Sequence, residues 1–411
     1  MTRKRVAVIG GGIVGLAAAL RTLERFPECE LTLLEKETDV GLHQSTHNSG
    51  VLHSGLYYTP GSLKAKLSVS GLLQMKDYCS RRNIAFEICG KLIAAVSAEE
   101  IHWLQDLFTR GQHNGLTGLE ILEGERVTEI EPHLKCLSAL RVPQEGIVDY
   151  GGVCDALKTD IGALGGEVLT GQRVVGLSEQ SGSWVIKACD AEREFDVIIN
   201  CAGLHSDRIC RLAGRRPRTQ IIPFRGEYYK IKPDRQYLVR NLIYPVPDPR
   251  YPFLGVHFTR LIHGGIECGP NAVLALAREG YRLTDFSLRD LAETICFRGF
   301  WAFSMKHTRM CMRELTLSMS KRLFCRALRR MVPDLTEDDI LSEGMAGVRA
   351  QAMHVDGKLV QDFEIVEGDK DIHVINAPSP AATASLAIGE RIAERVANRL
   401  SSIRIYNVGA I

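Results

Sequence analysis

The sequence of 411 residues contains no pair of cysteines with the spacing CxxC, although it has twelve cysteines. Its histidines also do not cluster with cysteines at the spacing of a zinc site, so we expect no metal centre. The cysteines are scattered from Cys29 to Cys325. This distribution indicates reduced thiols that fill the core rather than a disulfide framework.

A long apolar run and a strong net charge are also missing. The longest apolar stretch, Val6 to Leu20, contains four glycines and is too short to span a bilayer. No basic leader with a cleavage site precedes the first expected strand, so we expect a cytoplasmic protein. The net charge of +2 creates no global field for nucleic acid, which we therefore do not expect as a partner.

The sequence does contain a dinucleotide-binding pattern at its start. Residues 6–9 predict a buried parallel strand, and residues 13–26 have the apolar spacing of a crossover helix. Between them, Gly10, Gly12 and Gly15 occupy the glycine positions of GxGxxG. In this pattern the first glycine makes the tight turn, the second lets the backbone approach a pyrophosphate, and the third allows close packing of helix on strand.

A carboxylate follows at the expected distance. Glu35 ends the second apolar run, where it can accept hydrogen bonds from the ribose hydroxyls of an adenosine and would repel a 2′-phosphate. The pattern therefore disfavours NADP, but it does not choose between FAD and NAD.

Two later segments also predict contact with a ligand. The loop at residues 43–55 is rich in His, Ser and Asn and has no Lys or Glu, which favours a buried functional loop. Residues 195–203 form an apolar run that ends in glycine, typical of a central parallel strand that reaches a ligand.

The remaining pattern predicts an α/β protein with two domains. Helices are expected at 63–82, 98–113 and 152–164, and within 285–331. Short strands at 166–170, 174–177 and 183–188 predict a meander, and the Tyr-, Phe- and Pro-rich residues 217–276 predict an antiparallel sheet. The expected nucleotide domain, Rossmann-like with a parallel central sheet, comprises 1–88, 145–215 and 335–411, and an α+β substrate domain with a mixed or antiparallel sheet comprises 89–144 and 216–334.

Four segments carry a family resemblance: HNSGVLHSGLYY at 47–58, PFRGEY at 223–228, GPNA at 269–272 and NAPSPAA at 376–382. They resemble the L-2-hydroxyglutarate dehydrogenase/oxidase family, within the FAD-dependent D-amino-acid oxidase and glycerol-3-phosphate dehydrogenase superfamily. The resemblance covers nearly the whole chain and departs at residues 305–325. It implies non-covalent FAD and oxidation of L-2-hydroxyglutarate to 2-oxoglutarate.

The residues themselves also favour FAD over NAD, because the first strand, the loop at 43–55 and the helix start at 378–383 form three contact zones for an extended resident cofactor. Amides at Ser379 to Ala382 are expected to stabilise negative charge on the reduced flavin, and the backbone of Val174 to hold the adenine. The expected cofactor contacts are Gly10, Gly12, Ile13, Val14, Gly15, Glu35, Lys36, His47, Asn48, Ser49, Gly50, Val174, Ala202, Gly203, Arg349, Ser379, Pro380, Ala381 and Ala382.

Oxidation of a 2-hydroxy acid needs a base for the hydroxyl proton. His53 is the first candidate, because it lies in the loop that faces the flavin and matches the family pattern. His257 is the second candidate. The alternative for either histidine is a hydrogen bond that only orients the flavin or the sheet.

A dicarboxylate substrate also needs cations, and arginine binds a carboxylate through two parallel hydrogen bonds. The candidates are Arg349, Arg225 and Arg260, each of which could instead be an ordinary ion-pair partner. Three tyrosines are expected to line the pocket unless they belong to the core: Tyr57, Tyr58 and Tyr228.

Residues 298–330 carry eight further Lys and Arg side chains after Arg298 and one acidic residue, Glu314, among apolar residues. This composition predicts either peripheral contact with the anionic inner face of the cell membrane, where quinone could reach the flavin, or a solvated helix face. Quinone and oxygen both remain candidates for the electron acceptor. Two functional alternatives also stay open: another substrate, such as a different 2-hydroxy acid, an amino acid or glycerol 3-phosphate, and a flavin-binding protein without turnover.

Overall fold

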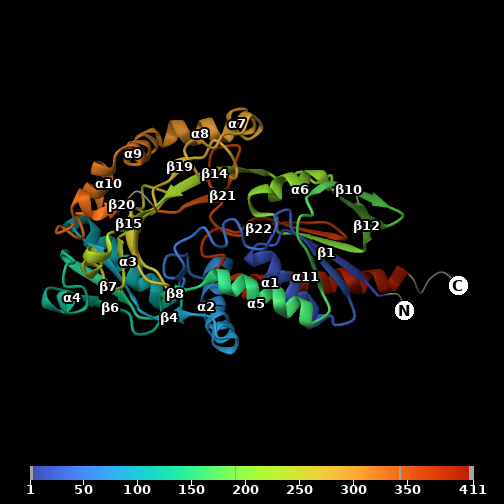
Figure 1. Cartoon of the computed structure of the whole chain (residues 1–411), viewed down its shortest axis with the longest axis horizontal. Coiled ribbons are helices and arrows are strands. Elements are labelled where there is room, and N and C mark those ends of the chain that lie inside the picture. Colours follow the sequence, from blue (N-terminus) through green and yellow to red (C-terminus); the bar gives the residue numbers. More distant parts are fainter. Residues whose placement is uncertain (1–2, 190, 342–343, 407–411) are drawn as a thin grey trace.

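The computed structural model describes residues 3–189, 191–341 and 344–406, and a six-stranded sheet forms one half of it (Figure 1). The strand order is β22-β23-β13-β1-β2-β9. Neighbouring strands are parallel except β22 with β23, which confirms the predicted parallel central sheet. The strands are β1 (Arg5–Ile9), β2 (Glu30–Leu34), β9 (Glu167–Leu169), β13 (Val197–Asn200), β22 (Glu364–Glu367) and β23 (Asp371–Asn376).

Both faces of this sheet are covered, which explains why β1 is apolar throughout. Val6 and Val8 point into a core shared with four helices, whereas Ala7 and Ile9 belong to a separate core on the other face. Alternate side chains of a strand point to opposite faces, so both positions must be apolar here. The four helices are α1 (Ile13–Arg25), α2 (Leu63–Arg82), α5 (Tyr150–Ala163) and α11 (Ser385–Tyr406).

The other face carries α6 (Ser206–Leu212) and an antiparallel meander of β10 (Val174–Gln180), β11 (Ser183–Ala188) and β12 (Ala191–Phe195). The prediction that residues 166–170 belong to this meander is wrong. These residues contain β9, which pairs in parallel with β2 at the edge of the six-stranded sheet. The preceding helix α5 is the crossover that a parallel connection requires.

The other half contains an eight-stranded sheet in the order β20-β15-β18-β17-β16-β5-β7-β6. β16 and β5 are parallel, and the other neighbours are antiparallel, which confirms the expected mixed sheet. Leu104 and Leu107 of the helix α3 pack on one face, and Phe324 packs on the other. The elements are α3 (Ala98–His113), α4 (Glu125–Ile130), β5 (Lys91–Ala95), β6 (Glu120–Leu122), β7 (Ser138–Val142), β15 (Tyr229–Ile231), β16 (Leu242–Pro245), β17 (His257–Arg260), β18 (Ile266–Gly269) and β20 (Ile340–Leu341).

Two three-stranded sheets join these halves. β14 and β21 pair over their full lengths, so β21 continues the second half although the prediction assigns residues 335–411 to the nucleotide domain. β20 likewise pairs with β15, so the chain returns to the six-stranded sheet only at β22. The strands of the small sheets are β3 (Val51–Leu52), β4 (Phe86–Glu87) and β8 (Gly146–Val148), and β14 (Thr219–Glu227), β19 (Val273–Leu274) and β21 (Ala346–His354).

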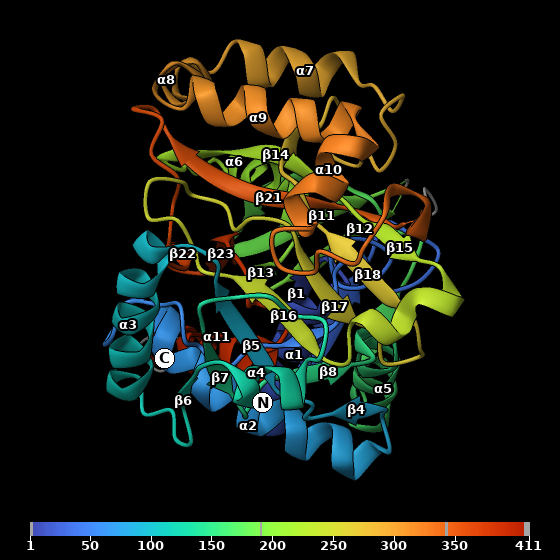
Figure 2. The same ribbon diagram turned by 90° about the vertical axis from the view of Figure 1, so that its left-hand side faces the viewer.

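Four helices form an outer layer above β14 and β21 (Figure 2). Phe303 and Met310 of this layer pack against Phe224 and Met353 of the two strands. The four helices of this layer are α7 (Leu288–Ile295), α8 (Arg298–Lys306), α9 (Thr308–Met319) and α10 (Lys321–Leu328), which confirms the expected helical segment.

Within the described ranges, no helix combines the length and the hydropathy needed to cross a bilayer.

Candidate active site

A cavity of about 1260 Å³ opens beside the carboxyl ends of β1, β2 and β13. Its other walls come from the second half, including residues of β16, β17 and β21. The volume exceeds the range of about 300–1,000 Å³ that suits a drug-sized ligand, so there is room for an extended cofactor and a small substrate. Ligands of open parallel sheets bind at the carboxyl ends of the strands, which is the position of this cavity.

Two glycines set the packing at the nucleotide end. Gly10 has a φ of +107°, and a Cβ on it would lie 2.6 Å from the carbonyl oxygen of Cys201 in the neighbouring strand connection. A Cβ on Gly15 would lie 2.0 Å from the carbonyl oxygen of Gly10. Any side chain at either position would therefore push α1 away from β1.

The amino end of α1 faces the cavity. Gly12 is its N-cap and makes no side-chain cap, the first turn contains no acidic residue, and Gly12, Ile13 and Val14 line the cavity wall. The N–H of Ile13 donates to Oγ of Ser45, 2.9 Å away. This end of the helix carries partial positive charge and is suited to a pyrophosphate.

Glu35 lies at the end of β2, as the sequence predicts, and lines the cavity. Its two carboxylate oxygens accept hydrogen bonds from the N–H of Gly11 at 2.6 Å and of Glu37 at 2.9 Å. These bonds fix the carboxylate at the adenosine end, where its remaining lone pairs can accept ribose hydroxyls.

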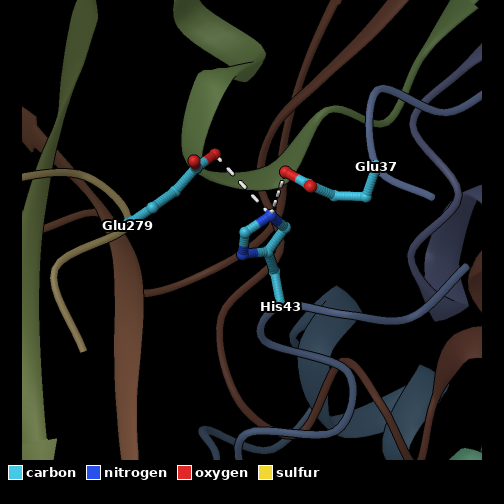
Figure 3. A group of neighbouring side chains, drawn as sticks. All are labelled: Glu37, His43 and Glu279. Carbon is cyan, nitrogen blue, oxygen red and sulfur yellow. Dashed lines mark hydrogen bonds and ion pairs between the residues drawn. The ribbon is translucent and has the colours of Figure 1, made fainter. Parts of the chain in front are cut away.

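The side chains of Glu37, His43 and Glu279 lie close together (Figure 3), and His43 and Glu279 line the cavity. His43 Nε2 lies 3.0 Å from Glu37 and 3.7 Å from Glu279, which comes from the segment after β19. These three side chains resemble a set of metal ligands. However, Lys36 Nζ lies 2.9 Å from His43 Nε2 and 2.7 Å from Glu279, and it also pairs with Glu37, so an ammonium group supplies the positive charge.

We call Lys36, Glu37, His43 and Glu279 the clamp, because they join the loop after β2 to the segment after β19. His205 adds a bond of 2.7 Å from Nε2 to Glu279. Burial would raise the pKa of Glu279, but its partners His205 and Lys36 outweigh burial and hold the pKa well below its usual value. The clamp therefore connects two segments more than 200 residues apart across the edge of the cavity.

His53 lies directly after β3 and lines the cavity. Its Nδ1 is 3.6 Å from Oε2 of Glu145, a fully buried carboxylate that the sequence gives no reason to single out. Burial lowers the pKa of His53, and Glu145 opposes this shift. His53 is thus neutral at neutral pH, with a carboxylate placed to stabilise it when it gains a proton.

His257, the second candidate, also lines the cavity but has a different environment. Its Nδ1 contacts the carbonyl oxygen of Gly255 at 2.9 Å, and its ring stacks on Tyr244 with centroids 3.8 Å apart. Burial lowers its pKa to about 3. Without a carboxylate partner, His257 is a poor acceptor for a proton, which favours His53 as the base.

The predicted arginines separate into two groups. Arg225 is buried, donates to the carbonyl oxygen of Arg282 and pairs with Glu227 at 2.9 Å. Arg260 pairs with Glu87 at 2.5 Å. Neither of these arginines lines the cavity, so the structure does not bring them to the expected substrate site.

Arg349 does line the cavity, from β21. It has no carboxylate within 4.0 Å among the described residues, and its guanidinium lies 5.6 Å from the ring centroid of Phe253. Lys64, which the sequence does not single out, is a second cavity cation with no carboxylate within 4.0 Å in the described ranges; its ammonium donates to the carbonyl oxygen of Gln361 at 3.3 Å, and the charge of Asp362 acts on it from farther away. Burial lowers the pKa of Lys64 to about 8, and its ammonium lies 4.4 Å from the centre of the Tyr58 ring.

Most other predicted residues also reach this cavity. The predicted helix start at 378–383 lines it, but the prediction of a helix there is wrong: α11 begins only at Ser385, and residues 379–384 form the turn before it. Gly15 and Gly50 lie behind the lining. The remaining predicted residues in the wall are Lys36, His47, Asn48, Ser49, Tyr57, Tyr58, Val174, Ala202, Gly203, Tyr228, Ser379, Pro380, Ala381 and Ala382.

Comparison with known proteins decides the family. A family model described as FAD dependent oxidoreductase matches residues 5–395. The chain belongs to the FAD-dependent oxidoreductase family. It is 47% identical to L-2-hydroxyglutarate dehydrogenase of Indibacter alkaliphilus over 95% of this chain and 98% of that protein. It is 44% identical to the human mitochondrial L-2-hydroxyglutarate dehydrogenase over 96% of this chain and 89% of that protein.

Solved structures share the fold of this FAD-dependent oxidoreductase. L-α-glycerophosphate oxidase of Mycoplasma pneumoniae, solved with FAD bound, has a TM-score of 0.79 at 22% identity and covers 97% of this chain and 95% of that chain. Glycine oxidase of Geobacillus kaustophilus has a TM-score of 0.71 at 16% identity, with 95% of each chain covered. The predicted cofactor and fold are therefore confirmed at the level of the family.

The cavity of this chain fits FAD. The glycine packing of β1 on α1 leaves backbone rather than side chains facing the pyrophosphate position, and Glu35 is fixed beside it. The loop at 47–49 and the turn at 379–382 line the same cavity farther along. One continuous cavity thus has contacts for both ends of an extended dinucleotide.

We predict that the clamp slows the release of FAD. Replacing Glu279→Gln removes the charge that holds Lys36 and His205, and should speed FAD dissociation by about three- to tenfold, the effect of losing one partly exposed ion pair. The rate can be measured from the rise in fluorescence of released FAD. Glu194→Gln, in an exposed pair with Arg5, is the matched control. Equal release rates for both variants would exclude a role of the clamp.

Proposed function

We propose that the protein oxidises L-2-hydroxyglutarate to 2-oxoglutarate, with His53 as the base. The observation that carries this proposal is one cavity in which a histidine beside a carboxylate lies together with two cations that have no carboxylate within 4.0 Å among the described residues. The curated relatives named above support the substrate, because they act on L-2-hydroxyglutarate by name and match nearly the full chain.

The two cations, Arg349 and Lys64, can each pair with one carboxylate of a dicarboxylate substrate. A bound carboxylate gains two parallel hydrogen bonds from a guanidinium, and among the described residues no carboxylate lies within 4.0 Å of Arg349. Lys64 provides a second positive charge in the same cavity. A substrate with a single carboxylate would leave one of these partly buried cations unpaired, which is costly, so the site favours substrates with two.

The proton and the hydride leave the substrate separately. Bound FAD would accept the hydride from the α-carbon. Nδ1 of His53 faces Glu145, so Nε2 is the nitrogen available to take the hydroxyl proton. The half-buried side chains of Tyr57, Tyr58 and Tyr228 line the cavity and help to exclude water from it.

Anaerobic reduction of the flavin tests the substrate. L-2-hydroxyglutarate should bleach the flavin absorbance of the purified protein within seconds, whereas the D-enantiomer should not. Lactate, glycerol 3-phosphate and an amino acid should react at least about a hundredfold more slowly, since none of them supplies a second carboxylate. Preferential bleaching by one of these compounds would favour the alternative substrates. A stable flavin that no substrate reduces would indicate a binding protein without turnover.

Arg349 and Arg260 provide a matched pair for the carboxylate site. Arg349→Met should lower kcat/KM by about tenfold to a hundredfold, chiefly through KM, because a charge-assisted hydrogen bond contributes about 1.5–3 kcal/mol. Arg260→Met should leave KM within about twofold, because that arginine is paired with Glu87 outside the cavity. Binding of 2-oxoglutarate, followed by the flavin spectrum, gives an independent measurement. Equal effects of both substitutions would contradict the assignment.

We also propose that the outer helices rest on an anionic membrane, from which quinone could reach the flavin. The apolar side chains of Met305, Met312 and Met319 are 73%, 59% and 78% exposed, among exposed basic residues. Glu314, the one acidic residue of this segment, points inward and accepts a hydrogen bond from the N–H of Ala272. The outer surface therefore combines apolar and positive groups, which is typical of interfacial helices.

Vesicle sedimentation tests this surface. The protein should sediment with vesicles that contain phosphatidylglycerol, and the double variant Arg309→Glu/Arg313→Glu should lose at least about fivefold of that binding. Arg81→Glu on α2, an exposed arginine far from these helices in sequence, is the control and should sediment as before. If the unchanged protein and both variants all fail to sediment with the vesicles, residues 298–330 form a solvated helix face.

Comparing turnover with oxygen and with a soluble quinone then identifies the electron acceptor.

A further inference from the structure

Two fully buried charges lie behind His53. The side chains of Lys91 and Glu145 have no exposed surface, form an ion pair with each other and do not line the cavity. Burying two charges is costly even when they pair, and apolar residues of similar size often stabilise a fold as well or better. Packing alone therefore gives no reason for this pair.

Strand pairing brings the pair to His53. In the antiparallel pair β3 and β8, Val51 lies opposite Ile147 and Leu52 opposite Gly146. Continuing this register by one residue places His53 opposite Glu145. The carbonyl oxygen of Glu145 accepts a hydrogen bond of 2.8 Å from the N–H of Gly90, which brings the start of β5, and with it Lys91, to the same point.

The carboxylate of Glu145 is held from both sides. Oε1 accepts hydrogen bonds from the N–H and the hydroxyl of Ser54 at 3.1 and 2.8 Å. Oε2 pairs with Nζ of Lys91 and lies 3.6 Å from Nδ1 of His53. Lys91 has aromatic neighbours besides, since its ammonium lies 4.0 Å from the ring centre of Tyr244 and 5.3 Å from that of Tyr57.

We propose that Glu145 and Lys91 are positioning residues for the base: Glu145 holds Nδ1 of His53 so that Nε2 faces the substrate, and Lys91 balances the carboxylate so that His53 rests unprotonated. This inference rests on the proposed function of His53. With Glu145 alone, an unopposed negative charge would protonate His53 before substrate binds. With Lys91 alone, an unopposed positive charge would prevent His53 from accepting the proton.

The charges around His53 agree with this balance. Burial lowers the pKa of His53, Glu145 raises it, and Lys91 lowers it. Burial would raise the pKa of Glu145, but Lys91 and His53 hold it well below the usual value, so Glu145 stays ionised. The other titratable or charged groups that face this cluster are Lys64, Cys89, Tyr57, Tyr58, Tyr244 and His257.

Opposite shifts of one pH profile test the proposal. In the FAD-loaded protein, the rate of anaerobic flavin reduction by L-2-hydroxyglutarate should rise with pH through the pKa of His53. Glu145→Gln should move this rise to lower pH by about one unit or more and slow the reduction by at least about thirtyfold. Lys91→Met should move the rise to higher pH by a similar amount. The double variant Glu145→Gln/Lys91→Met, which removes both charges, should return it to within about half a unit of the original position.

A second readout is independent of turnover. Diethyl pyrocarbonate acylates neutral imidazole, so the pH dependence of its reaction at His53, followed by peptide mass spectrometry, should show the same opposite shifts. Asp371→Asn is the matched control, because Asp371 is a buried carboxylate bonded to His373 and Arg215 and does not line the cavity. This substitution should destabilise the fold but leave both profiles in place.

The outcomes distinguish a failure of the positioning role of Glu145 and Lys91 from a failure of the proposed substrate. If the single variants lose stability as the control does, with both profiles unmoved, Glu145 and Lys91 are structural and the inference is wrong. Should either single variant fail to fold, the double variant still decides: slower flavin reduction with an unshifted profile supports the pair, and unchanged kinetics overturn it. If the labelling profiles shift but L-2-hydroxyglutarate never reduces the flavin, the proposed substrate fails and the charge balance stands.

Discussion

The pairing of β3 with β8 is the interaction on which the active site depends. β8 follows β7 of the eight-stranded sheet and leads into α5, which packs on the six-stranded sheet, so this strand joins the two halves covalently. β3 lies at the end of the polar loop that follows the dinucleotide-binding segment of β1, α1 and β2. When these two strands pair, His53, which follows β3, comes to lie beside the carboxylate of Glu145, which precedes β8. A shift of register by one residue would reverse which side chains face the cavity.

The distribution of ion pairs then shows where charge is left for a ligand. Arg225 and Arg260 are neutralised by carboxylates of their own surroundings, and Lys36 belongs to the clamp. Arg349 and Lys64 line the cavity without such a partner within 4.0 Å in the described part of the chain. A partly buried cation without a partner is costly in the free protein, and a bound carboxylate relieves that cost. Under the proposed function, recognition of a dicarboxylate would depend on which cations have no ion-pair partner rather than on how many cations the fold contains.

The sequence predicted features that depend on local pattern. The glycine spacing identified the tight packing of Gly10 and Gly15, and apolar periodicity located α2 and α3 with correct ends. Features that depend on distant pairing were not predictable in this way. β9 was assigned to the meander because a short alternating strand does not reveal its partner, and the pairing of β20 with β15 and of β21 with β14 was not visible for the same reason.

The site shows the same division. The motif around His53 was visible, whereas the partners that neutralise Arg225 and Arg260 could be found only in the folded chain. Glu145, Lys91, Lys64 and Glu279 were missed because none belongs to a recognisable motif. Each becomes significant only through a neighbour that is far away in the sequence, or through burial that the sequence does not reveal.

The burial of Lys91 and Glu145 also explains how two histidines in one cavity come to differ. Both His53 and His257 lose basicity by burial, and for His257 the contact that opposes this shift is the backbone carbonyl of Gly255. An isolated carboxylate beside His53 would restore too much, because the imidazolium would then be the resting form. Lys91, on the far side of Glu145, leaves the contact between Glu145 and His53 in place. It also offsets most of the negative charge of the carboxylate. The fold thereby gains a base that is neutral before the reaction and stabilised after it, at the expense of two charges that contribute little to stability.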